Sequence, residues 1–181
     1  MMRLFTIVAT AVLLLATTRP AAAQISLGPI VGAATAHIGP AIGTDDRGST
    51  LSVGGSVAVV ESTGWGAEFD AGFANNDDGR TGGLDAQSYM MSVIGVWPKG
   101  RLRPFGTFGA GVIHAHTCEN GCANTTAWTD WGLSGGGGAF YFLNETFGLR
   151  GDARYFSTAG RENGVGFWRI TIGATFLWSA D

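Results

Sequence analysis

The sequence contains little charge and no long hydrophobic run beyond its N-terminal region. Only 14% of its 181 residues are charged and lysine occurs once, at Lys99, whereas 45% are hydrophobic and 30 are glycine. After Gln24 no apolar segment approaches the about 20 residues that a membrane-spanning helix requires. This absence excludes a helical membrane domain there. The low charge is equally unusual for a soluble domain, in which about 25% of residues are charged.

The first residues have the composition of an export signal. Arg3 provides a positive start, and Leu4–Leu15 is an apolar run too short to span a membrane. Pro20–Ala23 then supplies the small residues of a cleavage site before Gln24. We therefore predict that residues 1–23 are a cleaved signal peptide.

The remaining residues 24–181 form one predicted domain of 181 − 23 = 158 residues. Removal of Arg3 and Arg19 leaves 11 − 2 = 9 basic against 14 acidic residues, which argues against nucleic acid as a partner. An exported, apolar, glycine-rich chain without a spanning helix can cross a membrane only as a closed β-barrel. The alternation of lipid-facing and lumen-facing residues in such a barrel leaves no long hydrophobic run.

Segments of alternating polarity, separated by turn residues, recur eight times along the chain. They are Pro29–Ile38, Thr50–Glu61, Gly64–Ala74, Ala86–Pro98, Leu102–His114, Ala127–Phe142, Phe147–Ser157 and Val165–Trp178. The number is even, as bacterial barrels require. The predicted fold is all-β, an eight-stranded antiparallel up-and-down transmembrane β-barrel.

The connections between these segments alternate in length. Three are short: Ser62–Thr63, Lys99–Arg101 and Leu143–Thr146. The other four are longer and polar: 39–49, 75–85, 115–126 and 158–164. Short periplasmic turns and long extracellular loops are typical of outer-membrane barrels. Both termini then lie on the periplasmic side.

Most segments divide into an apolar and a polar face. In segment 64–74, Trp65 and Phe69 share one face and Glu68 lies on the other. The alternation does not orient the segment at 86–98, where apolar residues fall on both faces.

The charged residues of the segments are expected inside the barrel. An eight-stranded barrel is just wide enough to be filled by side chains, and an unpaired buried charge there costs several kcal/mol. Four acids and four arginines take inward positions: Glu68, Asp70, Arg103, Asp130, Arg150, Asp152, Arg154 and Arg169. This self-neutralising set predicts a lumen plugged by ion pairs and not an open pore. It also places Arg150-Gly151-Asp152, a tripeptide associated with adhesion, in a strand and not on a loop tip.

Two stretches resemble a known family. RLRPFGTFGAGV at 101–112 and DWGLSGGGGAFYFLNETFGLRGDARYF at 130–156 are similar to strands of small outer-membrane β-barrel proteins of the OmpA/OmpX-like kind. The resemblance implies an outer-membrane location, with membrane lipid and lipopolysaccharide as surroundings.

The last segment resembles the signal that outer-membrane barrels present to their assembly machinery. The pattern is filled by Thr171, Gly173, Phe176 and Trp178. Three residues follow the final aromatic residue, a departure from the usual ending. The resemblance implies that the barrel assembly machinery is a partner through the C-terminal strand.

The two cysteines and two nearby histidines lie at the predicted extracellular rim. Cys118 and Cys122 are predicted to form a disulfide in this exported chain, with free or intermolecular thiols as the alternatives. His114 and His116 share a face and offer two ligands for a transition metal, but no third ligand is identified. We predict no metal site and no cofactor.

The predicted long loops are acidic. Their acids are Asp45, Asp46, Asp77, Asp78, Asp85 and Glu119. Carboxylates of this kind suit Ca²⁺ or Mg²⁺ shared with lipopolysaccharide, but they also keep loops solvated. The two interpretations stay open.

The functional prediction is a structural or surface-interaction protein with no catalytic residues and an unassigned extracellular ligand. Tyr89, Trp97, Trp168 and Trp178 would form its interfacial aromatic girdles. The alternatives are an outer-membrane enzyme acting on lipid A acyl chains and a soluble lipocalin-like binder. The charged lumen and apolar outer faces argue against the lipocalin.

Overall fold

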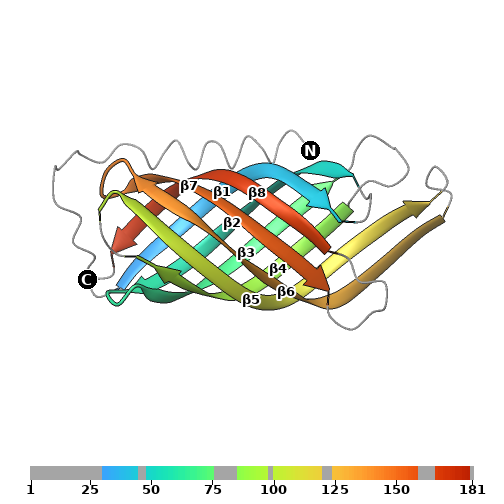
Figure 1. The fold of residues 1–181 in the computed structure, drawn as a ribbon, viewed down its shortest axis with the longest axis horizontal. Helices are drawn as coiled ribbons and strands as arrows, with labels where there is room; N and C mark the ends of the chain where they lie inside the picture. The colour runs from blue at the N-terminus through green and yellow to red at the C-terminus, as the bar shows by residue number, and fades with distance from the viewer. Residues whose placement is uncertain are drawn as a thin grey trace.

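Eight strands form a closed antiparallel barrel. The computed structural model describes residues 30–44, 48–75, 85–97, 100–119, 124–158 and 166–179. The strands are β1 (Ile30–Gly43), β2 (Ser49–Glu61), β3 (Trp65–Asn75), β4 (Asp85–Val96), β5 (Leu102–Glu119), β6 (Asn124–Phe142), β7 (Phe147–Thr158) and β8 (Gly166–Ser179). Each strand pairs with the next, and β1 pairs with β8 (Figure 1). The predicted fold class and all eight segments are confirmed.

The short connections lie together at one end of the barrel. Glycines adopt positive φ in two of them, Gly64 at 91° and Gly100 at 78°, where other residues would be strained. Val31 pairs with Ser179, so β1 begins and β8 finishes at this same short-turn end. Within the described ranges, no helix is long and apolar enough to cross a membrane.

Strand β1 is longer than the sequence indicated. Gly39 and Pro40 were expected to begin a loop, but the strand continues to Gly43 and Pro40 pairs with Leu51 of β2. On the other side, the pairing with β8 is interrupted at Gly39 and Pro40 and then resumes. The proline lacks an N–H group, so it removes a ladder bond without ending the strand.

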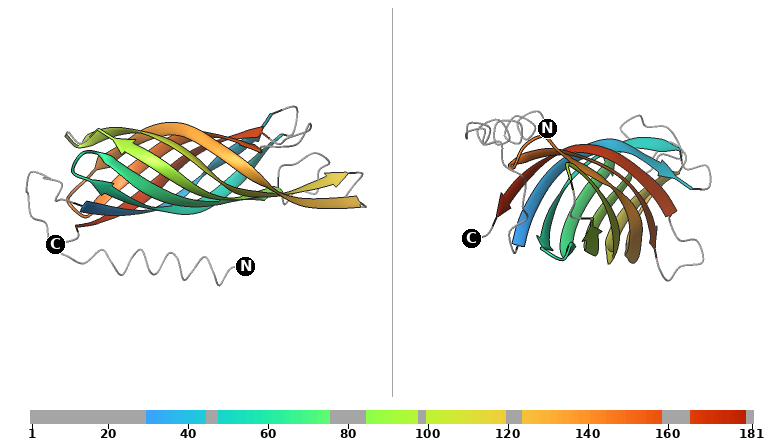
Figure 2. Two further views of the ribbon diagram at one scale, coloured as in Figure 1. Left: turned by 90° about the horizontal axis from the view of Figure 1, so that it is seen from below. Right: turned by 60° about the vertical axis from the view of Figure 1, so that its left-hand side comes forward.

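The β5–β6 hairpin is also longer than expected. Residues 115–126 were predicted to be a loop, yet the pairing continues through Thr117 with Thr126 to Glu119 with Asn124. The hairpin projects beyond the other strands at the end opposite the short turns (Figures 1 and 2). Its threonines are β-branched and fit an extended strand, which explains why a polar segment is not a loop here.

The two faces of the sheet differ as a membrane barrel requires. Large apolar side chains cover the outside, and in β4 Tyr89 and Met91 are exposed whereas Met90 and Ile94 are fully buried. The register thus orients the one segment that alternation alone left open. Met90 and Ile94 fill lumen space next to glycines, since Met90 is paired with Gly111 and Ile94 with Gly66.

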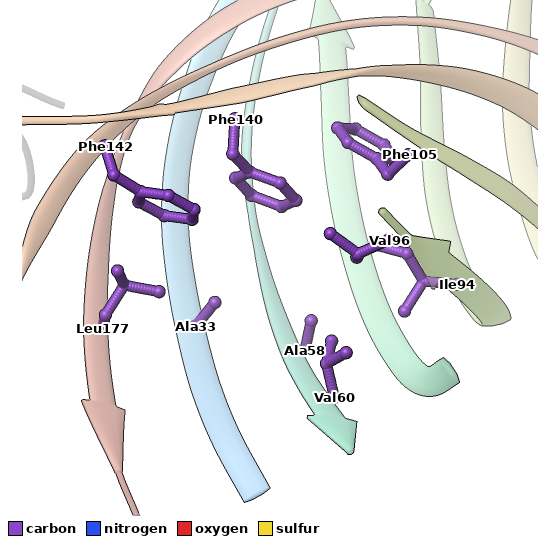
Figure 3. Close-up of a cluster of buried hydrophobic side chains, with 9 residues drawn as sticks. All are labelled: Ala33, Ala58, Val60, Ile94, Val96, Phe105, Phe140, Phe142 and Leu177. Atoms are coloured by element: carbon purple, nitrogen blue, oxygen red, sulfur yellow. The ribbon is translucent and has the colours of Figure 1, made fainter. Parts of the chain in front are cut away.

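The lumen is layered along the barrel axis. One apolar cluster fills the end opposite the short turns: Ala41, Ala74, Ala86, Met90, Ile113, Ala115, Phe156 and Phe167, with Trp128 packed against it. A second cluster fills the short-turn end (Figure 3): Ala33, Ala58, Val60, Ile94, Val96, Phe105, Phe140, Phe142 and Leu177. A charged cluster of inward residues lies between the two. We name these the loop-end cluster and the turn-end cluster.

Several sequence predictions concern parts outside the described residues. They are the signal peptide over residues 1–23, Cys122 with its disulfide to Cys118, and the loop acids Asp45, Asp46, Asp77 and Asp78.

Candidate functional site

A charged cluster occupies the middle layer of the lumen. Strand alternation directs Glu68 and Asp70 inward from β3, and Arg150, Asp152 and Arg154 inward from β7. Arg169 joins them from β8. Strand β3 pairs with neither β7 nor β8, so the arginine side chains reach across the lumen to the β3 carboxylates.

Arg150 binds acids on two strands. Its Nη2 donates to both oxygens of Glu68, at 3.0 and 3.2 Å, and its Nε donates to Oδ2 of Asp152 at 2.9 Å. Its Nη1 donates to the Ser56 hydroxyl at 3.2 Å. The fork of the guanidinium thereby connects β7 to β2 and β3, a geometry that lysine cannot reproduce.

Arg154 lies in the middle of the cluster and is almost fully buried. Its Nη2 is 2.7 Å from Oε1 of Glu68 and 3.4 Å from Oδ2 of Asp152. Its Nη1 is 3.9 Å from Oδ2 of Asp70. Arg154 therefore lies within ion-pairing distance of all three carboxylates.

Asp70 is the acceptor for two further groups. Nη2 of Arg169 lies 2.5 Å from its Oδ1, and Nε2 of His37 lies 3.1 Å from its Oδ2. His37 is buried on β1 and is a member of the cluster that the sequence reasoning missed. The sequence could have indicated its inward position, because His37 lies two residues after Thr35 and alternation directs both side chains to the lumen.

Hydroxyl groups complete the layer. Thr171 of β8 donates to Oδ1 of Asp152 at 3.0 Å. Thr35 and Thr175 are hydrogen-bonded to each other at 2.9 Å where β1 meets β8. Neutral donors next to the carboxylates lower the free-energy cost of burying them.

The structure does not bring Arg103 and Asp130 into this cluster. Arg103 is the second residue of β5, at the short-turn end, where its Nε donates to the Gly100 carbonyl at 3.1 Å and its guanidinium lies 4.9 Å from the centre of the Phe142 ring. Asp130 is half-buried on β6 opposite Ile113, in the loop half. Both residues face the lumen side, but their heights along the axis separate them from the middle layer.

The charges within the cluster balance. Three guanidinium groups face the three carboxylates of Glu68, Asp70 and Asp152, so these six charges sum to zero. Aromatic rings border it on both sides: the Arg150 guanidinium lies 4.5 Å from the centre of the Phe105 ring, and that of Arg169 lies 4.7 Å from the centre of the Phe156 ring. Cation–π contact with these rings connects the charged layer to the two apolar clusters.

The other predicted site residues lie in the barrel wall. Of the four in the C-terminal strand, Thr171 is buried, while Phe176 and Trp178 alternate with it on the outer face. Gly173 lies against β1, where a Cβ would be 2.3 Å from the Ala36 carbonyl oxygen. At the loop end, Nδ1 of His114 is hydrogen-bonded to Oγ1 of Thr129. In the part of the chain that the structure describes, no three His, Cys, Asp or Glu residues are arranged to hold a metal ion.

The outer surface has aromatic residues near both ends. Tyr89, Trp97, Trp168 and Trp178 are all exposed. Trp97 and Trp178 lie at the short-turn end, whereas Tyr89 and Trp168 lie in the other half. A closed barrel with an apolar, aromatic-bordered exterior and a charged interior is a transmembrane β-barrel.

Comparison with known proteins gives the family. The sequence model described as the outer membrane protein beta-barrel domain matches residues 8–176, and the chain belongs to this family. Its location is the outer membrane. A comparison with curated protein sequences gives no match.

Solved structures share the fold at low sequence identity. The N-terminal β-barrel domain of Pseudomonas aeruginosa OprF is 14% identical with a TM-score of 0.61, over 82% of this chain and 97% of that one. Neisserial surface protein A is 17% identical with a TM-score of 0.55, over 81% and 95%. Ail of Yersinia pestis, an attachment invasion locus protein solved with a heparin analogue, is 15% identical with a TM-score of 0.52, over 82% and 98%.

Proposed function

We propose that this protein is a non-conducting outer-membrane barrel whose role is structural or surface interaction. The observation that carries the proposal is the layered lumen. A solute moving along the axis would meet the loop-end cluster, then the charged cluster, then the turn-end cluster. Each layer opposes passage for a different physical reason.

The charged layer resists opening because its members share partners. Glu68 accepts from both Arg150 and Arg154, and Asp70 accepts from Arg169 and contacts His37. Moving one arginine aside leaves a buried carboxylate with fewer donors, at a cost of about 3–5 kcal/mol. The apolar layers add the cost of transferring an ion into a region without polar partners.

The projecting β5–β6 hairpin supports the surface role. The pairing of β6 with β7 starts only at Gly132 with Thr158. Residues 124–131 of β6 therefore have no β7 partner among the described residues, and the hairpin to which they belong projects beyond the other strands (Figure 2). A strand edge of this kind can contact other molecules through its backbone. No extracellular ligand is assigned.

Assembly is proposed to depend on the C-terminal strand. Thr171, Gly173, Phe176 and Trp178 match the recognition pattern of the barrel assembly machinery, and β8 closes the barrel against β1. We also propose the Cys118–Cys122 disulfide near the hairpin tip, because the chain is exported to an oxidising compartment.

Catalysis is not part of the proposal. The alternative was an enzyme acting on lipid A acyl chains, which would need a nucleophile activated by a histidine and a carboxylate. His114 is hydrogen-bonded to the Thr129 hydroxyl on the adjacent strand, and the chemistry of lipid A tests whether this pair has a catalytic role. Lipid A isolated from cells with and without the protein is expected to have the same acyl composition, and a difference would favour the enzyme.

Conductance across a planar bilayer tests the closed barrel. The purified, folded protein is expected to add no stable conductance steps, since all three layers block the axis. The control is the double variant Arg150→Ser with Arg154→Ser, which removes two of the three guanidinium groups and is expected to conduct more than the native protein. Stable, uniform steps from the native protein would overturn the proposal.

A further inference from the structure

A groove of about 530 Å³ crosses the outer wall of the barrel between β3 and β6, beside the short turns. Its floor is bare backbone. Gly95 of β4 is paired with Gly106 of β5, which is paired in turn with Gly137 of β6. A Cβ added to Gly106 would meet nothing closer than the Gly136 carbonyl oxygen at 4.0 Å. The hollow over these glycines is therefore not filled by the protein's own side chains.

The walls of the groove are apolar and aromatic. Val93 of β4 and Trp97, which directly follows β4, flank Gly95, and Phe108 flanks Gly106 on β5, each two residues away on the same outer face. The Trp65 ring closes the β3 side, 3.2 Å from the position of a Gly95 Cβ. These four large side chains are all exposed on the outer surface, which places them against membrane lipid.

Polar and charged residues lie at the short-turn end of the groove. Thr107 borders the groove between Gly106 and Phe108, but its side chain alternates to the lumen face, where it is buried opposite Ile94. Thr63 borders the groove at the β2–β3 turn, and Arg101 is exposed in the neighbouring β4–β5 turn. Interfacial arginine and tryptophan commonly anchor membrane proteins at the headgroup level.

We propose that this groove binds one phospholipid molecule of the periplasmic leaflet. An acyl chain would lie over Gly95 and Gly106 between the aromatic walls. The phosphate would lie near Arg101, whose exposed positive charge it complements.

Two other occupants fit this groove less well. A second copy related by a two-fold axis presents the same concave patch, so groove would face groove and leave a void. Lipopolysaccharide occupies the opposite leaflet, whereas the groove begins at Thr63 on the short-turn side.

Native mass spectrometry can test the proposal. The mature chain is reconstituted in nanodiscs of phosphatidylethanolamine and phosphatidylglycerol, released into mild detergent and weighed. The native protein is expected to retain one phospholipid. Gly106→Leu places a side chain over the floor, starting from a Cβ that has no other atom closer than 4.0 Å, and is expected to lose the lipid. Ala110→Leu is the matched control, because Ala110 is exposed on the same face of β5 outside the groove, and it is expected to keep the lipid.

Phe108→Ala provides a second variant if Gly106→Leu does not fold. It removes one wall and is expected to reduce lipid retention, with folding checked by heat-modifiable gel mobility. A native protein that retains no phospholipid would overturn the proposal, as would equal retention by both groove variants. Loss of lipid from Ala110→Leu as well would indicate nonspecific annular lipid, and retention of added lipopolysaccharide in its place would indicate a different ligand. Either result would also overturn it.

Discussion

At the scale of single residues, shared acceptors explain how six charges are buried together. Glu68 is contacted by Arg150 and Arg154, and Asp70 by Arg169, Arg154 and His37. Each carboxylate thus has several donors, which compensates for the loss of water. Arginine suits this position because it stays charged and its planar fork can bind two acids at once.

Glu68→Gln is expected to destabilise the barrel strongly. The neutral amide removes one of the two carboxylates that Arg150 and Arg154 share and leaves the buried cluster with an excess positive charge, so the free energy of unfolding should fall by about 3–5 kcal/mol. Urea unfolding in lipid vesicles, followed by tryptophan fluorescence, measures this change. Glu61→Gln is the control, since Glu61 is exposed at the end of β2 and should change stability little. Equal effects from the two variants would contradict a structural role for the cluster.

His37→Leu is expected to have a smaller effect. It removes the contact at 3.1 Å to Asp70 but leaves the bond from Arg169 to the same carboxylate. A hydrogen bond to a charged group contributes about 1.5–3 kcal/mol, so the loss should be less than that of Glu68→Gln in the same unfolding experiment. A larger loss than that of Glu68→Gln would mean that His37, and not the arginines, holds the β3 carboxylates.

At the scale of elements, closure of the barrel depends on the contact between β1 and β8. Gly173 is opposite His37 in this pairing, and the Ala36 carbonyl oxygen would lie 2.3 Å from a Cβ on Gly173. A side chain at this position would force the two strands apart. The same glycine belongs to the proposed assembly pattern, so it has both a steric role and a proposed recognition role.

Gly173→Val is expected to impair closure of the barrel. The fraction of purified protein that shows the faster, heat-modifiable mobility after refolding in detergent should fall, because the added side chain meets backbone and cannot move away. Refolding in detergent involves no assembly machinery, so this experiment isolates the steric role. The matched variant Ala174→Val points outward into detergent and should refold as the native chain does. Normal refolding of Gly173→Val would show that the contact can relax.

The β5–β6 hairpin is expected to be dispensable for folding. Thr117 and Thr126 are paired, so residues 118–125 can be replaced by Asn-Gly, which favours a tight two-residue turn. The loop-end cluster, including Trp128, is kept. The urea midpoint should remain that of the native chain. A large fall would show that the projecting part stabilises the barrel, and would argue against its being a free interaction surface.

At the scale of the whole molecule, the two ends of the barrel are predicted to face different compartments. The short turns and both ends of the described chain lie together, and the hairpin projects from the opposite end (Figure 1). An epitope inserted after residue 121 should bind antibody on intact cells, whereas one appended after Asp181 should require permeabilised cells. Surface exposure of the C-terminal epitope alone would reverse the orientation.

The strand alternation accounts for what could be predicted. The period of two identified all eight segments and the inward positions of Glu68, Asp70 and Arg154, because a charged side chain and a lipid-facing side chain cannot share a face. It did not give strand ends. Pro40 stops a helix or a central strand in most proteins. Here it interrupts only the pairing of β1 with β8, while the pairing with β2 continues. Whether the strand continues past the proline thus depends on the partner strands.

The sequence by itself determined the class of this protein. Its alternating polarity, its even number of segments and its balance of acids and arginines allow only a closed barrel with charges inside. The tertiary structure decided which of those charges meet. Height along the barrel axis depends on the register between strands that are distant in the chain, and it brings His37 to Asp70 while it separates Arg103 and Asp130 from the middle layer. Alternation specifies the face of each residue, but only the pairing of all eight strands specifies its height.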